Sequence, residues 1–206
     1  MNFDANNLLG VDLSHFEPPM DWQAAKAAGV SWMYTKATDG TGMKDWTAKM
    51  HTDGAKSVGI PRGVYHFLRN ADPLAQWDNF QSVASGLELE LAYILDWETE
   101  GVAGMSHDHQ ISVAQAWLDQ AEKACGKVPI IYTERALMLE LELPESFARY
   151  PVIFARYNSF LGSIPAPWTK ATAWQYSDSG KPAGVPAGHS VDCNVFYGTI
   201  DQLLAL

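Results

Sequence analysis

Basic residues and cysteine are scarce in this sequence, and it contains no long apolar run. Its 14 Lys and Arg residues stand against 24 Asp and Glu residues, which gives a formal net charge of −10 at pH 7. Binding to nucleic acid needs a basic face for the phosphates, so this composition argues against nucleic acid as the main partner. No apolar stretch approaches the ~20 residues that span a bilayer, so we expect no membrane insertion.

The two cysteines, Cys125 and Cys193, are isolated in the sequence. We predict that both are free thiols, because isolated cysteines are more often buried thiols than a disulfide, although the sequence leaves their pairing open. The N-terminal segment, Met1 to Asn7, is polar and has no basic n-region, so it lacks the pattern of a cleavable secretory signal. We therefore expect that the protein works in the cytoplasm or leaves it by another route.

Motifs of several reaction classes are missing as well. The sequence has no Gly-x-Gly-x-x-Gly turn, no phosphate-binding loop and no Gly-x-Ser-x-Gly elbow. His107 and His109 have a spacing that a metal site can use, but Ser106 is a candidate N-cap that places both in a solvated first helical turn. We expect no metal and no cofactor.

What is present indicates a single globular domain over residues 1–206, with 47% hydrophobic residues and 8 each of Trp, Tyr and Phe. Short apolar segments predict eight strands: Leu8–Leu13, Ser31–Lys36, Pro61–Phe67, Leu91–Trp97, Val128–Tyr132, Val152–Ala155, Ala171–Tyr176 and Ser190–Val195. Helical patterns cover Asp21–Ala28, Asp45–Val58, Pro73–Ser85, Ser106–Cys125, Glu134–Leu141 and Thr199–Leu204.

The alternation of strands and helices predicts an α/β fold with a parallel sheet. Eight strands favour a modified TIM-like β/α barrel, with reduced helices in the C-terminal third, where helical patterns nearly disappear. An open doubly wound sheet is the competing architecture, and the missing phosphate-binding turns argue against it.

The most informative segment is Tyr93–Glu98, an apolar run that ends in Asp96 and Glu98. Residues two apart in a strand point to the same face, so both carboxylates project together and away from Leu95 and Trp97. Cleavage of a glycosidic bond uses such a pair, because one carboxylic acid protonates the leaving oxygen and one carboxylate stabilises positive charge at the sugar. The alternative is a pair of acids at a solvated strand end.

Barrel enzymes place their catalytic residues at the C-terminal ends of strands, and further acids and aromatic residues at the predicted C-terminal ends of other strands, Asp192 of the last strand among them, favour the catalytic interpretation. Closing a barrel places Asp12 of the first strand beside Asp192 of the last. Four acids at buried strand ends are hard to explain as structure alone, because each costs desolvation energy. The surrounding side chains predict a floor on which sugars stack, and they are Tyr65, Tyr132, Arg156, Tyr157, Trp174 and Tyr176.

Eight short motifs follow one another along almost the whole chain. They are Gly10–His15, Asp21–Trp22, Lys36–Gly40, Gly63–Phe67, Asp96–Glu98, Ala155–Tyr157, Trp174–Ser177 and Val191–Asn194. In this order they resemble glycoside hydrolase family 25, the Chalaropsis-type lysozymes (N-acetylmuramidases). Departures from the family pattern are Asp39 in place of the commoner Glu, Phe154 in place of Trp, and Cys193 in place of an aliphatic residue.

The resemblance implies hydrolysis of the β-1,4 bond between N-acetylmuramic acid and N-acetylglucosamine in peptidoglycan. Carried over to the matching positions, Glu98 is the proton donor and Asp96 its partner, with Asp12 and Asp192 completing the acidic site. Lys36 joins the substrate-binding candidates. Asp96 either attacks the anomeric carbon or orients the 2-acetamido group that attacks it, and the sequence does not decide between these roles.

The implied partner is a peptidoglycan glycan strand, bound by a monomer. Action on the cell wall, in the periplasm or outside the cell, then requires export through holin-dependent lysis, as for a phage endolysin, or through a secretion machine. A chitinase-like endo-N-acetylglucosaminidase is a second enzymatic hypothesis. A non-catalytic glycan-binding barrel is a third, against which the four retained acids argue.

Overall fold

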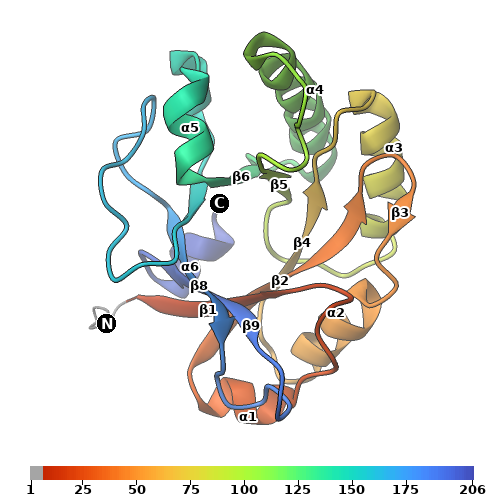
Figure 1. The fold of residues 1–206 in the computed structure, drawn as a ribbon. Helices are drawn as coiled ribbons and strands as arrows, with labels where there is room; N and C mark the ends of the chain where they lie inside the picture. Colours follow the sequence, from red (N-terminus) through yellow and green to blue (C-terminus); the bar gives the residue numbers. More distant parts are fainter. Residues whose placement is uncertain (1–6) are drawn as a thin grey trace.

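Residues 7–206, as described in a computed structural model, form a barrel of strands with helices around it (Figure 1). The N-terminal segment Met1 to Asn7, on which the prediction about a secretory signal depends, lies outside the described residues except for Asn7. The strands are β1 (Leu8–Leu13), β2 (Val30–Asp39), β3 (Met43–Lys44), β4 (Arg62–Phe67), β5 (Ile94–Trp97), β6 (Ile130–Glu134), β7 (Val152–Ala155), β8 (Ala173–Gly180) and β9 (Val191–Phe196). The helices are α1 (Trp22–Ala27), α2 (Ala48–Ser57), α3 (Pro73–Ala84), α4 (His107–Cys125), α5 (Arg135–Leu141), the 3-10 helix η1 (Glu145–Arg149) and α6 (Ile200–Leu204).

The order of the strands confirms the predicted barrel. Hydrogen-bonded neighbours follow the order β1-β9-β8-β7-β6-β5-β4-β2, and β1 also pairs with β2, which closes the ring. Each predicted strand and helix has a counterpart, whereas β3 and η1 are additional. The described connections 156–172 and 181–190 contain no helix, as expected for the C-terminal third.

The direction of β9 corrects the prediction of a parallel sheet. β9 runs antiparallel to both of its neighbours, β8 and β1. A parallel connection needs a crossover of about a dozen residues or more, usually a helix, and the loop 181–190 supplies none. Asp192 therefore lies at the start of its strand and not at the C-terminal end, where we predicted it. The reversed direction still brings it to the rim at which β1 ends, because Asp12 pairs with Asp192 in the register.

Alternation along the strands decides which side chains fill the barrel. Tyr34 and Ile94 belong to a buried cluster whose members come from strands all round the ring, so they point inward. Lys36 and Asp96 lie two residues further along the same two strands and point to the same side. The polar residues therefore cap an apolar barrel interior at its open end.

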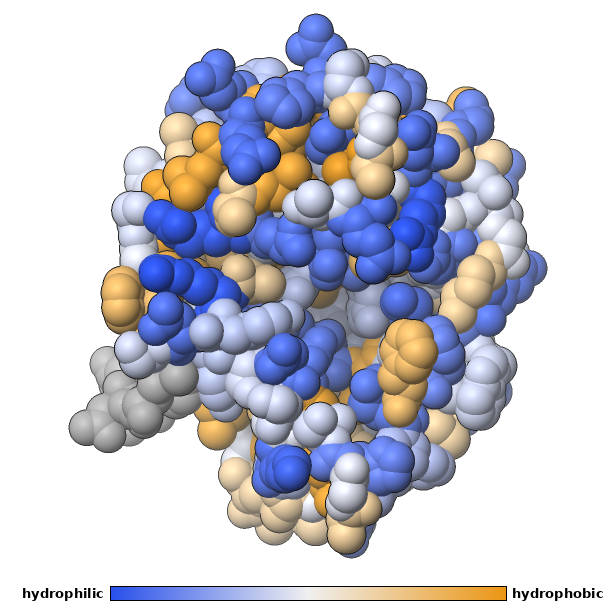
Figure 2. Space-filling view, viewed as in Figure 1, coloured by the Kyte–Doolittle hydropathy of each residue, from blue (hydrophilic) through white to orange (hydrophobic). Residues whose placement is uncertain are grey.

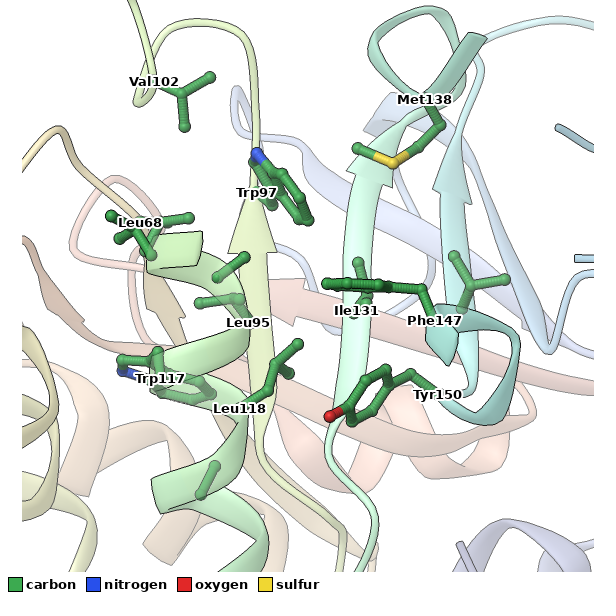
Figure 3. Close-up of a cluster of buried hydrophobic side chains, with 14 of the residues drawn as sticks. Leu68, Leu95, Trp97, Val102, Trp117, Leu118, Ile131, Met138, Phe147 and Tyr150 are labelled. Atoms are coloured by element: carbon green, nitrogen blue, oxygen red, sulfur yellow. The ribbon is translucent and has the colours of Figure 1, made fainter. Parts of the chain in front are cut away.

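The outward faces of the strands pack against the helices. Leu95 and Trp97 of β5 share one buried cluster with Trp117 and Leu118 of α4, and Figure 3 shows members of this cluster on β5 and on the neighbouring turns of α4. The prediction that Leu95 and Trp97 project away from the two carboxylates is thus confirmed. This packing fixes the strand that carries Asp96, since the side chains of Leu95, Trp97 and Trp117 are fully buried. No helix in the described chain is long and apolar enough to cross a membrane.

Candidate active site

A pocket of ≈ 200 Å³ occupies the open end of the barrel interior. The face drawn in Figure 2 is hollowed near its centre, and hydrophilic residues surround most of the hollow. Seven of the predicted site residues line the pocket: Asp12, Lys36, Tyr65, Asp96, Glu98, Tyr132 and Asp192. The four predicted acids are therefore brought together by β1, β5 and β9.

Asp96 and Glu98 form a hydrogen-bonded carboxyl pair. Burial and the neighbouring charge of Glu98 raise the pKa of Asp96 well above its usual range. Burial also raises the pKa of Glu98, although the hydrogen bond with Asp96 opposes this shift. Oδ1 of Asp96 is buried without a hydrogen-bond partner, and an unpaired buried polar atom costs about 1–3 kcal/mol, more if the group is charged. Burial therefore favours a protonated form of the pair.

Asp12 and Asp192 form the second acidic pair. Oδ2 of Asp12 accepts hydrogen bonds from Asn194 Nδ2 at 2.7 Å and from Gln175 Nε2 at 2.9 Å. Burial raises the pKa of Asp12, and these two amide donors oppose that shift. Burial and the charge of Asp12 raise the pKa of Asp192 to about 9. Asp12 is thus the better placed of the two to carry a negative charge, while Asp192 is protonated at neutral pH.

Lys36 is the one basic residue among the described residues that line the pocket. Its Nζ lies 5.0 Å from the ring centroid of Phe67 and 5.8 Å from that of Tyr65. Its positive charge lowers the pKa of Asp12, Asp96 and Glu98 against the larger effect of burial. A single cation therefore interacts with several acids, so ionising all of them at once costs free energy through the repulsion between like charges.

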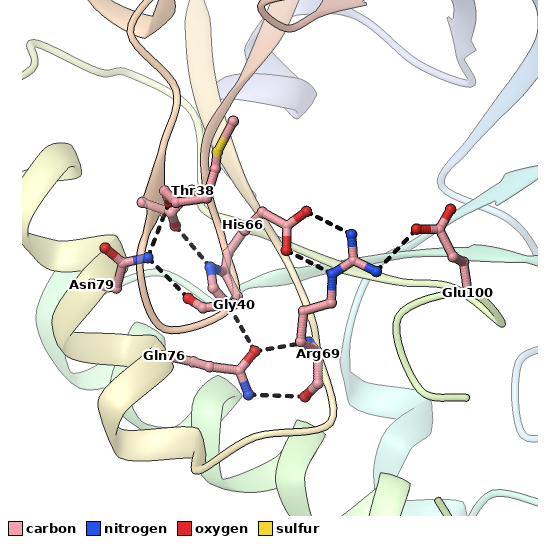
Figure 4. A network of polar contacts seen from close by, with 9 residues as sticks. Thr38, Gly40, His66, Arg69, Gln76, Asn79 and Glu100 are labelled. Carbon is pink, nitrogen blue, oxygen red and sulfur yellow. Dashed lines mark hydrogen bonds and ion pairs between the residues drawn. The ribbon is translucent and has the colours of Figure 1, made fainter. Parts of the chain in front are cut away.

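A polar network behind β2 and β4 holds the Lys36 side of the pocket (Figure 4). Arg69 binds Asp39 through two hydrogen bonds of 2.6 and 2.8 Å, and its guanidinium carbon lies 4.4 Å from the ring centroid of Phe67. The buried His66 ring contacts Thr38 Oγ1 at 2.7 Å and Gln76 Oε1 at 3.2 Å. The ring of Phe67 thus contacts both the guanidinium of Arg69 and the ammonium of Lys36.

The predicted aromatic residues divide into two groups. Tyr65 and Tyr132 line the pocket, and burial raises the pKa of both well above the usual range, so their hydroxyls are neutral. Tyr132 and Tyr157 donate hydrogen bonds to Gln175 Oε1, at 2.7 and 2.9 Å. Tyr157 itself is 53% exposed and lies beside the pocket.

Arg156, Trp174 and Tyr176 do not line the pocket. Arg156 donates to the Leu161 carbonyl at 2.6 Å, and Trp174 Nε1 donates to the Arg156 carbonyl at 2.8 Å. Trp174 is buried, and its ring meets that of Tyr176 edge to face. Both project from the face of β8 opposite to Gln175, so the structure gives them a supporting position, and sugar contact by these three residues stays a prediction.

The histidines His107 and His109 are exposed in the first turn of α4. Ser106 accepts a hydrogen bond from the His109 amide at 3.3 Å, which confirms the predicted N-cap. Within residues 7–206, no group of three or more His, Cys, Asp or Glu side chains is placed to hold a metal ion. Cys125 and Cys193 are free, as predicted.

Comparison with known proteins identifies the barrel. The sequence model of Glycosyl hydrolases family 25 matches residues 11–185. The chain belongs to family 25 of the glycosyl hydrolases. This family 25 enzyme is 30% identical to Lysozyme M1 of Streptomyces globisporus, and the match covers 98% of the present chain and 72% of the relative. The N,O-diacetylmuramidase of a Chalaropsis species is 28% identical, over 96% of this chain and 97% of the relative. The crystal structure of the bacterial lysozyme from Streptomyces coelicolor aligns with a TM-score of 0.89 at 30% identity and covers 98% of both chains.

Three pocket or pocket-side residues of this family 25 enzyme escaped the sequence analysis as functional candidates. Glu17 lines the pocket and accepts hydrogen bonds from the amide and hydroxyl of Ser14, at 2.6 and 3.1 Å. Phe16 also lines it, although 74% of this residue is exposed. Gln175 is buried and bonds to both acids of the second pair. Phe16 and Glu17 lie in a turn whose sequence has no periodic pattern, so no signal pointed to them. Gln175 belongs to the Trp174–Ser177 motif, and this motif could have identified it as a candidate.

Proposed function

We propose that this family 25 glycoside hydrolase is a muramidase that cleaves the β-1,4 bond between N-acetylmuramic acid and N-acetylglucosamine, with Glu98 as proton donor. The observation that carries the assignment is the hydrogen-bonded pair of Asp96 and Glu98, which shares one pocket and has raised pKa values. The substrate is supported by the relatives, whose names are lysozyme and N,O-diacetylmuramidase. These names favour the muramidase over the chitinase-like alternative.

In the proposed reaction, the glycosidic oxygen lies against Glu98. The proton of Glu98 passes to this oxygen while its bond to the anomeric carbon of the muramic acid residue breaks, and N-acetylglucosamine leaves with a new hydroxyl. Glu98 is then a carboxylate that removes a proton from the water that completes hydrolysis. A donor of this kind must reach the substrate protonated, and burial of Glu98 favours that form.

Asp96 is best suited to orient the 2-acetamido group. Burial raises the pKa of Asp96 and so favours its protonated form, which is a weak nucleophile. An acetamide N–H that donates to Asp96 favours its ionised form, so the shared proton stays with Glu98, where the leaving oxygen needs it. The acetamide oxygen then attacks the anomeric carbon, which places Asp96 in a substrate-assisted mechanism.

The remaining residues stabilise charge and hold the sugar. In this proposal the carboxylate form of Asp12, which the amides of Asn194 and Gln175 favour against the effect of burial, stabilises the positive charge that develops at the anomeric centre. Lys36 and the neutral hydroxyl of Tyr65 face the pocket as donors to sugar oxygens, whereas the Tyr132 hydroxyl, which donates its proton to Gln175, can accept a hydrogen bond from a sugar hydroxyl. The partner in this proposal is the glycan strand of peptidoglycan, and the enzyme acts on the cell wall as a monomer, after export by holin-dependent lysis or by a secretion machine.

The assignment is tested with Glu98→Gln, which keeps the shape of the side chain and removes its proton. We expect a loss of at least ~100-fold in the release of reducing ends from purified peptidoglycan, in line with general acid contributions. Glu140→Gln, an exposed residue of α5, is the matched control and should behave as wild type. Near-normal activity of a folded Glu98→Gln protein would remove Glu98 from its role. Activity of the wild type on chitin oligomers without activity on peptidoglycan would replace the muramidase by the chitinase-like enzyme.

A further inference from the structure

Glu134, the last residue of β6, lies beside the proposed proton donor although it does not line the pocket. Trp97 pairs with Thr133 in the register of β5 and β6. Glu98 and Glu134 are the next residues after this pair, and the two strands lie about 4.8 Å apart. Tyr132, two residues before Glu134, lines the pocket, so the alternation along β6 turns Glu134 toward the same side.

The side chain of Glu134 bonds to the residue that follows Glu98. Its Oε2 accepts a hydrogen bond from the Thr99 amide at 3.1 Å and a second, short one from the Thr99 hydroxyl. Glu134 is also the residue that precedes α5, but its side chain makes no capping bond to that helix. The carboxylate is therefore used to hold the backbone after Glu98, and not to start the helix.

The charge of Glu134 acts on Glu98 as well. The titratable and charged groups that face Glu98 are Asp96 on its own strand, Lys36 of β2, Asp12 of β1, Tyr132 and Glu134 of β6, and Tyr157 after β7. Burial is the first cause of the raised pKa of Glu98, and the negative charge of Glu134 raises it further, while Lys36 acts in the opposite direction.

We propose that Glu134 is a positioning residue for the proton donor: through Thr99 it holds the segment after Glu98, and its charge sets the pH range in which Glu98 donates. The inference rests on the proposed role of Glu98. It assigns two separable effects to one carboxylate, because the hydrogen bonds need only an acceptor oxygen, whereas the effect on pH needs the charge.

Two variants separate these effects. Glu134→Gln keeps an acceptor oxygen and removes the charge, so the pKa of Glu98 falls and the alkaline limb of the kcat profile moves to lower pH, by about one pH unit. Thr99→Val keeps the charge and removes the hydroxyl, so kcat falls several-fold while the alkaline limb stays in place. Glu140→Gln serves again as the control for loss of an exposed charge, and peptidoglycan hydrolysis is followed from pH 4 to 9.

The outcomes decide between the proposals. An unshifted alkaline limb in Glu134→Gln, with thermal unfolding as in the wild type, would overturn the charge effect, and a wild-type kcat in Thr99→Val would overturn the hold on the backbone. If Glu134→Gln does not fold, Glu134→Asp replaces it: the shorter carboxylate should keep the position of the alkaline limb and lower kcat, and a moved limb contradicts the inference. High activity of Glu98→Gln, by contrast, would contradict the proposed function itself, and the role of Glu134 would fall with it.

Discussion

Nε2 of Gln175 lies 2.9 Å from Oδ2 of Asp12, and this bond fixes the orientation of the whole Gln175 amide. Its Oε1 accepts hydrogen bonds from the hydroxyls of Tyr132 and Tyr157, at 2.7 and 2.9 Å. A flipped amide would turn its oxygen toward a carboxylate and its N–H groups toward hydroxyls. One buried amide of β8 therefore joins an acid of β1 to a tyrosine of β6, across the floor of the pocket.

Replacement of Gln175 by Met should damage both stability and activity. The substitution leaves Asp12 with one amide donor and removes the acceptor of two tyrosine hydroxyls, so we expect a loss of about 1–3 kcal/mol in the free energy of unfolding. We expect kcat/KM to fall by roughly tenfold or more, because the pKa of Asp12 rises when a donor is lost. Urea unfolding and peptidoglycan hydrolysis measure the two effects. Gln81→Met, at an exposed position of α3, is the control, and equal behaviour of the two variants would contradict the role of Gln175.

Hydrolysis should proceed with net retention at the anomeric carbon. Attack by Asp96 and attack by the acetamide each invert this carbon once, and water inverts it again. Single displacement by an activated water needs a more open carboxyl pair, about 6.5–9.5 Å apart, whereas Asp96 and Glu98 are within hydrogen-bonding reach of each other. Proton NMR of early products, recorded before mutarotation, should show the β-anomer. Initial α-anomer would make Asp96 a base that activates water.

His66 should make the protein less stable as the pH falls. Burial lowers the pKa of His66 from 6.5 to about 4, and its ring stacks on Trp117 with centroids 5.4 Å apart. Because the folded-state pKa is depressed, the unfolded chain binds the proton more tightly, so the contribution of His66 is complete above the unfolded pKa and is lost as the pH falls through the folded one. The loss is on the order of 3 kcal/mol across this window.

The comparison of His66→Leu with the wild type isolates this contribution. The acids of the pocket have raised pKa values and act in the opposite direction, and they are common to both proteins. Urea unfolding at pH 7 and at pH 4 should show that the stability advantage of the wild type over the variant shrinks on acidification. An advantage that is constant, or that grows, would mean that His66 is not buried in its neutral form.

The helices, the strands and the first acidic pair could be predicted from local patterns. Strand and helix periods are local properties, so each predicted segment formed, and the N-cap at Ser106 was found from one residue and its neighbours. The spacing of Asp96 and Glu98 requires only the pleat of one strand to bring them together. Barrel closure added Asp12 and Asp192 to the same site, because the first and last strands of a ring must meet.

The direction of β9 and the partners of the site residues depend on contacts between segments that are far apart in the chain. Asp192 lies at the predicted rim of the barrel, but it lies near the start of β9 and not at its end as predicted. The direction of a strand depends on how the preceding loop, here 181–190, folds back and not on the strand itself. The same holds for β8, where the aromatic Trp174 faces away from the pocket while Gln175 reaches Asp12. Glu134 contacts Thr99 across 35 positions of sequence, and such contacts arise from the register of neighbouring strands, which no local pattern records.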